Sequence, residues 1–172
     1  RDERPQYPDD GGLFERAAAL GDAIAAAYEA CEYREATRLC MTLADAANEY
    51  VEQKAPWTIK KDPERAGELQ DVCTVVLNLF RQIVIYLTPI TPDLAEKAGA
   101  LLQDPIERWD QASKPLVGTP VETFKHMMAR VETAKVEALF ASTDEVEAPT
   151  GKPGSVAPES GATDSDTLQQ EP

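Results

Sequence analysis

The chain has 172 residues, of which 42% are hydrophobic and only 6% aromatic, a mix that fits one domain of ordinary size and favours helices over a β-sandwich. The formal net charge of −14 argues against broad, sequence-blind binding of nucleic acid, which needs many Lys and Arg side chains. A short basic or aromatic patch can still contact RNA, because salt screens the remaining charge over roughly 10 Å.

The N-terminal part is expected to be a linker followed by one helix. Residues 1–12 are polar and rich in Pro and Gly, which is typical of a linker. From Leu13 to Cys31, apolar residues recur at three- and four-residue steps, and this spacing predicts an amphipathic helix. Gly21 lies inside it and either weakens the helix slightly or lets a neighbour approach closely.

A second helix is predicted at about residues 33–53, with an apolar face that includes Tyr50. Arg34 and Arg38 are four residues apart, so they lie one above the other on the same face, near the beginning of this helix. The helix is expected to end before Pro56, because Pro disfavours a helical residue in front of it.

Two further helices are predicted from Pro residues at their first positions. The third starts near Asp62-Pro63 and runs to about residue 87; its apolar residues nearly surround the C-terminal half, so it should be the most buried helix. Thr91-Pro92 is expected to open a fourth helix in the same manner, reaching about residue 102.

The C-terminal part is irregular and then polar. Residues 104–130 contain several Pro and Gly residues and are expected to form an ordered loop on the bundle, with Trp109 and Phe124 as candidate anchors. A last short helix is predicted at about 134–141. Residues 142–172 are acidic and poor in apolar side chains, so they cannot offset the entropy of ordering and are expected to be disordered.

Together these elements predict an all-α fold, an antiparallel helix bundle of four or five helices with a disordered acidic C-terminal tail. The expected organisation is a linker at 1–12, one helical domain at 13–141 and a tail at 142–172. Because the chain begins at Arg1 and has no initiator Met, we expect a fragment or a processed product.

Several functional classes are disfavoured. Cys31, Cys40 and Cys73 form no C-x-x-C pair, so we expect reduced, mostly buried thiols and no metal site. There is no Gly-rich phosphate loop and no hydrolase or metalloprotease motif, and the lone His126 is expected to be a surface or half-buried residue. No signal peptide and no run of ~18 uninterrupted apolar residues occur, which predicts a cytoplasmic location without membrane or DNA partners.

Three motifs then resemble a known family. Residues 47–57, ANEYVEQKAPW, resemble the A-N-x-Y-[VI]-x-x-x-x-P-W stretch of methionyl-tRNA synthetases of the bacterial type. Residues 77–81, LNLFR, and 86–92, YLTPITP, resemble the helix and turn that follow, and Arg108-Trp109-Asp110 resembles a later x-W-[DE] segment. The first two motifs occur more loosely in the leucyl, isoleucyl and valyl enzymes, but their order, their spacing and the Trp109 segment fit the methionyl family best over residues 13–141.

The resemblance implies a helical domain that lies behind a Rossmann-type catalytic domain and binds the methionine anticodon, CAU. In the family, an Arg on the second helix and a residue one turn earlier, often Asn, face the anticodon, and a loop Trp stacks on its first base. By alignment, Arg38, Arg34 and Trp109 occupy these three positions. The chemistry suits RNA, since a Trp plate contributes ~1–3 kcal/mol per stacked base and a guanidinium donates to base edges or phosphates.

Arg34 departs from the family pattern, because Asn both donates and accepts hydrogen bonds whereas Arg only donates. Arg34 could read a base edge, hold a phosphate, or pair with Glu35, Glu32 or another carboxylate. Structural roles are expected for four other residues: a plug at the end of the bundle for Trp57, a place on an apolar helix face for Tyr50, and bridging hydrogen bonds for the two asparagines, Asn48 and Asn78.

The resemblance implies a parent enzyme, a methionine–tRNA ligase that uses ATP and Mg²⁺ and often carries a structural zinc. The nucleotide-binding motifs and the zinc knuckle of that family are absent here, so no cofactor and no activity are expected of this chain alone. The expected partners are tRNA(Met) and the catalytic domain of the same polypeptide. The alternative is a stand-alone helical adaptor that binds a protein, and an unrelated helical enzyme is a weaker third possibility.

Overall fold

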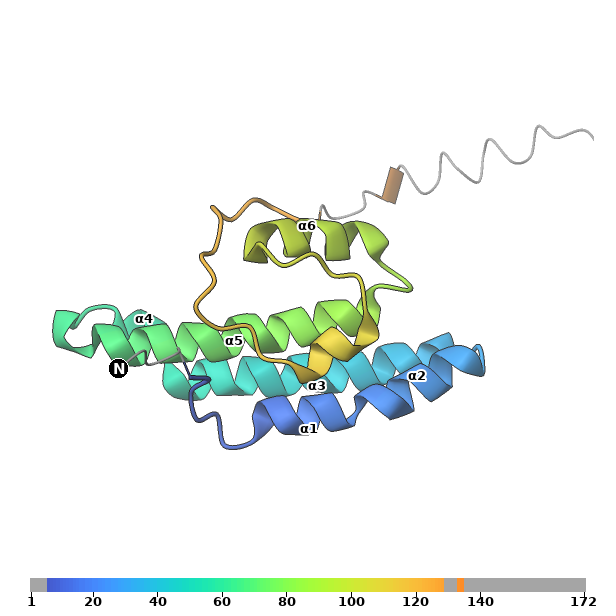
Figure 1. Cartoon of the computed structure of the whole chain (residues 1–172), viewed down its shortest axis with the longest axis horizontal. Coiled ribbons are helices and arrows are strands. Elements are labelled where there is room, and N and C mark those ends of the chain that lie inside the picture. The colour runs from blue at the N-terminus through green and yellow to red at the C-terminus, as the bar shows by residue number, and fades with distance from the viewer. Residues whose placement is uncertain (1–5, 129–132, 135–172) are drawn as a thin grey trace, which may run out of the picture. The chain divides into compact units, whose positions relative to one another are not determined.

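A computed structural model describes residues 6–128, 133 and 134, and in these residues the chain is helical, without strands (Figure 1). This confirms the predicted all-α bundle. The predicted helix at 134–141, apart from residue 134, and the predicted tail at 142–172 lie outside the described residues. The elements in chain order are α1 (Leu13–Ala19), α2 (Gly21–Glu29), α3 (Tyr33–Lys54), α4 (Pro56–Ile59), η1 (Pro63–Arg65), α5 (Ala66–Leu87), α6 (Pro92–Leu102) and η2 (Trp109–Ser113).

The first predicted helix is two helices, α1 and α2, which are separated at Leu20. The cause is Tyr86 on α5, whose hydroxyl donates to the Ala17 carbonyl at 3.2 Å, a carbonyl near the end of α1. A Cβ on Gly21 would lie 3.0 Å from that hydroxyl oxygen. Gly21 therefore permits the close approach that was one of its two predicted roles, and the inserted side chain breaks the helix.

The predicted linker is partly ordered, because residues immediately before α1 pack and cap that helix. The Asp10 carboxylate accepts hydrogen bonds from the backbone N–H groups of Gly12, Leu13 and Phe14 at 2.8, 3.1 and 2.8 Å. The ring of Tyr7 packs on Phe14 with a centroid separation of 5.1 Å. A carboxylate at a helix N-terminus satisfies unpaired donors and opposes the helix dipole, so the ordered domain begins before residue 13.

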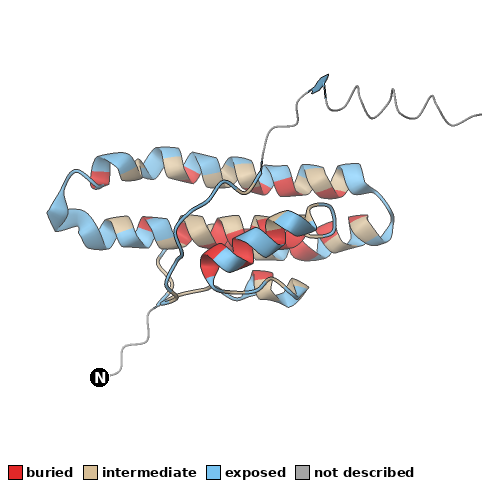
Figure 2. Ribbon diagram, turned by 90° about the horizontal axis from the view of Figure 1, so that it is seen from above, coloured by how far each residue is buried: buried red, intermediate tan, exposed pale blue. Residues whose placement is uncertain are grey.

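The core of the bundle lies where α5 packs against α1 and α3 and where α2 packs against α3, and buried residues face inward along these helices (Figure 2). α5 carries the largest set of buried side chains, as the sequence predicted for the third helix. The apolar members of this core include Ile24, Ala36, Cys40, Leu43, Tyr50, Val75, Leu79 and Ile85.

By length and composition alone, the segment Pro63–Leu87 could cross a membrane, since its apolar window has a mean hydropathy of 1.2. Half of that window is buried inside the bundle, and a core helix of this kind passes the same test. The window also contains three buried polar side chains, Asn78, Arg81 and Gln82. These features describe the central helix of a bundle.

The cysteines differ from the sequence expectation. Cys40 is fully buried in α3, and burial raises the pKa of its thiol to about 11. Cys31 and Cys73 are both exposed. Cys31 lies beyond the end of α2 with a φ of 58°, in the left-handed region that ends a helix, and Cys73 is on the outward side of α5, so neither belongs to the apolar stripe that the sequence pattern assigned to it.

α6 and the chain that follows it cover one side of α5 (Figure 1). Ala95 and Ala98 of α6 pack against Val84 of α5. After α6 the chain crosses α5, forms η2 and returns to α6, where the Glu122 N–H donates to the Leu101 carbonyl at 2.8 Å. Residues 104–116 are thus held on the bundle as an ordered loop, in the way that the sequence predicted for this part.

Candidate nucleic-acid interface

Trp109 opens η2 and is half-buried against two tyrosines. Its ring lies 5.0 Å from the Tyr86 ring and 6.3 Å, edge-on at 88°, from the Tyr28 ring, measured between centroids. The Tyr28 hydroxyl in turn donates to the Tyr86 carbonyl at 2.9 Å. Trp109 is therefore anchored along part of its surface, while the remainder stays accessible to solvent.

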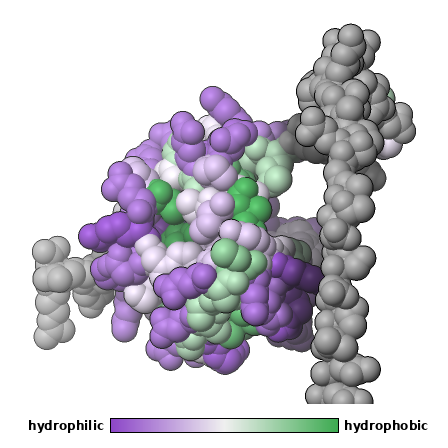
Figure 3. Space-filling model, turned by 90° about the vertical axis from the view of Figure 1, so that its right-hand side faces the viewer, coloured by the Kyte–Doolittle hydropathy of each residue, from purple (hydrophilic) through white to green (hydrophobic). Residues whose placement is uncertain are grey.

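The aromatic contacts continue from Trp109 to the beginning of α3. Tyr28 lies 6.3 Å from Tyr33, the first residue of α3, again between ring centroids. Burial raises the pKa of Tyr28, and a hydrogen bond with the Cys31 thiol raises the pKa of Tyr33. Trp109 thus lies near the end of the bundle where α2 stops and α3 starts, and Figure 3 shows hydrophobic patches flanked by hydrophilic side chains at this end.

A hollow of about 190 Å³ lies beside Trp109, between the end of α5 and the residues that precede η2. Its lining is mostly apolar but ends in charged side chains at the rim, which suits a planar group that stacks on one side and meets charge on the other. The lining residues are Ile85, Thr88, Pro89, Ile106, Glu107, Arg108 and Trp109.

Arg38 is exposed and paired with a neighbour on its own helix. Its Nε and Nη2 donate to the two carboxylate oxygens of Glu35 at 2.8 and 2.6 Å, and this hydrogen bonding lowers the pKa of Glu35. The Arg38 side chain is 62% exposed, so solvent screens the pair and RNA phosphate could compete for the guanidinium.

Arg34 is also exposed, and no carboxylate among the described residues pairs with it. Of the alternatives considered for Arg34, the pairing with Glu35 is not formed, because Arg38 takes that carboxylate. Contact with a base edge and contact with a phosphate both stay open for Arg34.

The structure brings Trp109 and the first turn of α3 to one end of the bundle, but no contact among the described residues joins Trp109 to Arg34 or Arg38. On α3 the two arginines lie about 160° to 200° around the helix from Ala36, which is fully buried. They therefore project away from the core, and their convergence with Trp109 on one nucleotide stays a prediction.

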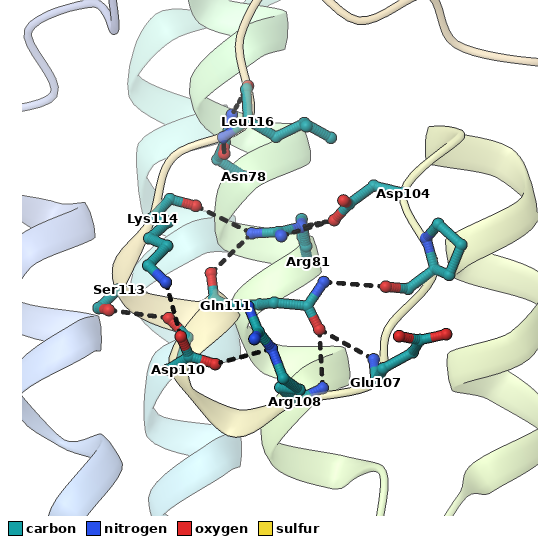
Figure 4. Close-up of polar contacts among 11 residues, drawn as sticks. Asn78, Arg81, Asp104, Glu107, Arg108, Asp110, Gln111, Ser113, Lys114 and Leu116 are labelled. Atoms are coloured by element: carbon teal, nitrogen blue, oxygen red, sulfur yellow. Dashed lines mark hydrogen bonds and ion pairs between the residues drawn. The ribbon is translucent and has the colours of Figure 1, made fainter.

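The loop that carries Trp109 is held by Arg81, a residue of α5 that is only 4% exposed (Figure 4). The Arg81 Nε donates to the Asp104 carboxylate at 2.7 Å, and its Nη1 donates to the carbonyls of Gln111 and Lys114 at 2.8 and 3.0 Å. Arg81 was not among the site residues predicted from the sequence, although it is the last residue of the NLFR motif. A buried Arg within an apolar helix was the signal that could have identified it.

Two neighbours of Arg81 on α5 hold the same loop further along. Asn78 donates to the Leu116 carbonyl at 2.8 Å and accepts from the Leu116 N–H at 2.7 Å, which is a bridging role of the kind expected from the sequence. Gln82 donates to the carbonyls of Phe14 and Ala112 at 3.0 and 2.8 Å and so connects α1 with η2.

The loop also braces itself next to Trp109. The Gln111 Oε1 accepts from the backbone N–H groups of Glu107 and Arg108, each at 2.8 Å, and its Nε2 donates to the Pro105 carbonyl at 2.8 Å. Asp110 accepts from the Lys114 ammonium at 2.6 Å, and this bond lowers the pKa of the carboxyl group. Together these bonds give the backbone around Trp109 a defined path.

Two residues that the sequence assigned to structural roles are placed differently. Trp57 is 56% exposed, because α4 is a single turn and its inward position is taken by Ile59, which lies about 200° around the helix and is 2% exposed. Asn48 is exposed on α3, outside the stripe that faces the other helices, and its side chain makes no hydrogen bond within residues 6–128.

The other assignments concern Tyr50 and the region of Phe124. Tyr50 is buried in the core, 6% exposed, as its position on the apolar face suggested. Phe124 is 63% exposed and is therefore no anchor; it contacts the exposed His126 with ring centroids 5.9 Å apart. Within the described part of the chain, no cluster of three or more His, Cys, Asp or Glu side chains is placed to hold a metal ion.

Comparison with known proteins shows which proteins this chain is similar to. Residues 8–145 match the family described as the anticodon binding domain of methionyl tRNA ligase. The chain is 55% identical to the methionine–tRNA ligase of Rhodopirellula baltica over 148 residues, 54% to methionine–tRNA ligase 1 of Sorangium cellulosum over 151, and 37% to the methionine–tRNA ligase of a Psychrobacter species over 159. The alignments cover 86%, 86% and 91% of this chain and 22%, 22% and 23% of those proteins, so the chain spans about a fifth of their length.

Proposed function

The chain belongs to the family of anticodon-binding domains of methionyl-tRNA ligase, and from that premise we propose that it recognises the CAU anticodon of tRNA(Met). The observation that carries the proposal is the placement of Trp109, a half-exposed indole on a braced loop at one end of the bundle. Sequence-specific RNA recognition uses unstacked loop bases that stack on such aromatic faces.

Charge supports a local rather than a general contact with RNA. The chain carries a net charge of −14, so it has no broad attraction for phosphate. Near the end of the bundle where α3 begins, Arg34 is exposed without a carboxylate partner among the described residues, and Arg38 can exchange Glu35 for a phosphate or a base edge. Binding is therefore expected to depend on the splayed anticodon bases and to weaken with salt.

The remaining parts of the function belong to a longer polypeptide. The relatives are ligases about four times the length of this chain, so we place the ATP-dependent attachment of methionine, with the Mg²⁺ and the structural zinc that often accompany it, in segments that this chain does not contain. In this proposal the chain contributes tRNA binding and packs with the catalytic domain in the cytoplasm, and it has no ligase activity by itself.

A titration with anticodon stem-loops tests the proposal. The 172-residue chain should bind a CAU loop more tightly than a GAU loop, and Trp109→Ala should remove that preference while circular dichroism shows an unchanged helix content. The lost preference should be roughly fivefold or more, because one stacked base contributes ~1–3 kcal/mol. Equal binding of both loops by the unmodified chain would contradict the proposal and would favour the alternative of a protein-binding adaptor.

In the complete ligase, Arg38→Ala should lower the rate of tRNA charging and leave methionine-dependent ATP–pyrophosphate exchange unchanged. The exchange reaction needs no tRNA, so it serves as the internal control for a folded catalytic domain. Loss of both activities in parallel would indicate misfolding and would remove the support that Arg38 gives to the proposal.

A further inference from the structure

We propose that Arg81 is a positioning residue for anticodon discrimination: without touching RNA, it fixes the loop on which Trp109 presents its ring. The inference rests on the proposed function, in which Trp109 stacks on an anticodon base. It gives the last residue of the NLFR motif a role in positioning the Trp109 loop, which the sequence motif alone did not indicate.

Arg81 contacts the loop on both sides of Trp109. On the N-terminal side its Nε donates to the carboxylate of Asp104 at 2.7 Å, and on the C-terminal side its Nη1 donates to the carbonyls of Gln111 and Lys114 at 2.8 and 3.0 Å. Among the described side chains outside residues 104–116, Arg81 alone makes bonds on both sides of Trp109 (Figure 4). Movement of either flank relative to α5 therefore breaks at least one of these bonds.

The chemistry of the guanidinium suits this task. It is planar and presents five donors in a fixed fork, so one side chain can bind acceptors on separate segments at once. A Lys ammonium at the same place keeps the charge, but it is a compact group on a flexible stem and cannot reproduce the fork. The conservative variant Arg81→Lys therefore separates the geometric role of Arg81 from its charge.

Burial explains why this link is rigid. The Arg81 side chain is 4% exposed, whereas the Asp104 side chain is 24% exposed. A buried charge that loses its partners is strongly disfavoured, so the loop is held to the geometry that satisfies Arg81. A buried ion pair is weak evidence for stability as such, and its better-supported use is to specify one arrangement among several.

The rest of the loop transmits this geometry to the indole. Gln111, whose carbonyl binds Arg81, uses its side chain to hold the N–H groups of Glu107 and Arg108, the two residues before Trp109. The Trp109 ring then meets Tyr86, which lies five residues beyond Arg81 on α5. Contacts with α5 therefore hold both the backbone and the ring of Trp109 in position.

The first experiment uses fluorescence to follow the surroundings of Trp109 in the absence of RNA. In a Trp57→Phe background Trp109 is the single tryptophan, because the chain has two, and its fluorescence reports its surroundings. Arg81→Lys should raise acrylamide quenching and shorten the anisotropy decay of Trp109 while the helical circular dichroism persists. Arg65→Lys, an exposed arginine paired with Glu68 at the beginning of the same helical segment, is the matched control and should change neither quantity.

The second arm measures CAU and GAU stem-loop binding by the same variants. Arg81→Lys should lose most of the CAU preference that Trp109→Ala loses, an effect between roughly fivefold and 150-fold. If Trp109→Ala loses the preference while Arg81→Lys keeps both the preference and the unmodified quenching, the positioning role of Arg81 is overturned and the proposed function stands. If Trp109→Ala keeps the preference, Trp109 does not carry the discrimination, and the role of Arg81 in it is overturned while recognition of CAU stands. Equal binding of both loops by the unmodified chain would instead overturn the proposed function.

A second variant covers the case in which Arg81→Lys does not fold. Asp104→Asn removes the charged partner from a more exposed position and keeps the size of the side chain. It should shift quenching and CAU preference in the same direction as Arg81→Lys, by a smaller amount. A folded Asp104→Asn chain with unchanged quenching and unchanged preference would overturn the inference.

Discussion

The central helix α5 is joined to its neighbours by two different kinds of contact. Toward the other helices of the bundle the contact is an apolar cluster, to which α5 contributes Val72, Val75, Leu79 and Ile85. Toward the loop 104–116 it presents Asn78, Arg81 and Gln82, which bond to backbone groups and to Asp104. Apolar burial is non-directional, whereas a hydrogen bond requires both distance and angle. The apolar side of α5 therefore makes the bundle stable, and the polar side determines where Trp109 lies.

The largest effect on stability should come from the apolar side. Leu79→Ala removes a side chain that is 4% exposed and should lower the free energy of unfolding by about 3 kcal/mol, as large-to-small core changes do. Urea denaturation measures this change. In the Trp57→Phe background, acrylamide quenching of native Trp109 should stay the same, in contrast to Arg81→Lys. If Leu79→Ala raised quenching as much as Arg81→Lys, the apolar side of α5 would position Trp109 as strongly as the polar side.

Gly99→Ala tests the close approach of the loop backbone to α6 and should change the free energy of unfolding by about 1 kcal/mol. A Cβ on Gly99 of α6 would lie 3.2 Å from backbone atoms of Asp104, Pro105 and Ile106. Overpacking of this kind costs about 1–3 kcal/mol, and the better helix propensity of Ala returns about 1, so Gly99→Ala should destabilise the fold and displace the start of the loop.

Gly67→Ala is the matched control for this prediction. Gly67 also lies in a helix, but an added Cβ would meet nothing within 4 Å. It should stabilise the chain by about 0.5–1 kcal/mol in the same urea experiment. Stabilisation of similar size by both substitutions would show that the loop does not depend on close approach to α6.

The smallest effect should appear at the turn between α2 and α3, which brings Tyr33 to the Trp109 end. Cys31 has a φ of 58°, and the N–H groups of Cys31 and Glu32 donate to carbonyls of the last turn of α2. Glycine adopts this conformation without a steric penalty, so Cys31→Gly should stabilise the chain by about 0.5 kcal/mol.

Cys73→Gly, in the middle of α5, provides the comparison for Cys31→Gly, because glycine is unfavourable inside a helix. Thermal unfolding should therefore move the two variants in opposite directions. Destabilisation by both would mean that the left-handed turn after α2 is not strained by a cysteine.

The sequence predicted the helices well where the signals were local. The third helical segment was predicted to start near Asp62, and there the Asp62 carboxylate accepts from the Glu64 N–H at 3.0 Å; the all-α fold and the central helix were also predicted. The break at Leu20 was missed, because it depends on the hydroxyl of Tyr86, a residue more than sixty positions away. A helix period describes which side chains share a face, but it does not describe which distant side chain will be inserted there.

The two tryptophans show the same limit at the level of the site. The sequence suggested that Trp57 plugs the bundle and that Trp109 is a candidate anchor and stacking plate; the structure exposes Trp57 and rests Trp109 on two tyrosines. Trp57 is exposed because the four-residue helix α4 has one inward position, and Ile59 occupies it.

Composition, periodicity and motif order along the chain were enough to predict the helical class, the family and the aromatic and basic residues that could meet RNA. The enclosure of Arg81 between two stretches of one loop, and the projection of Arg34 and Arg38 from the outer face of α3, became visible only in the folded chain. Burial and hydrogen-bond partners arise where segments distant in sequence meet. No local pattern encodes which acceptors a guanidinium will reach.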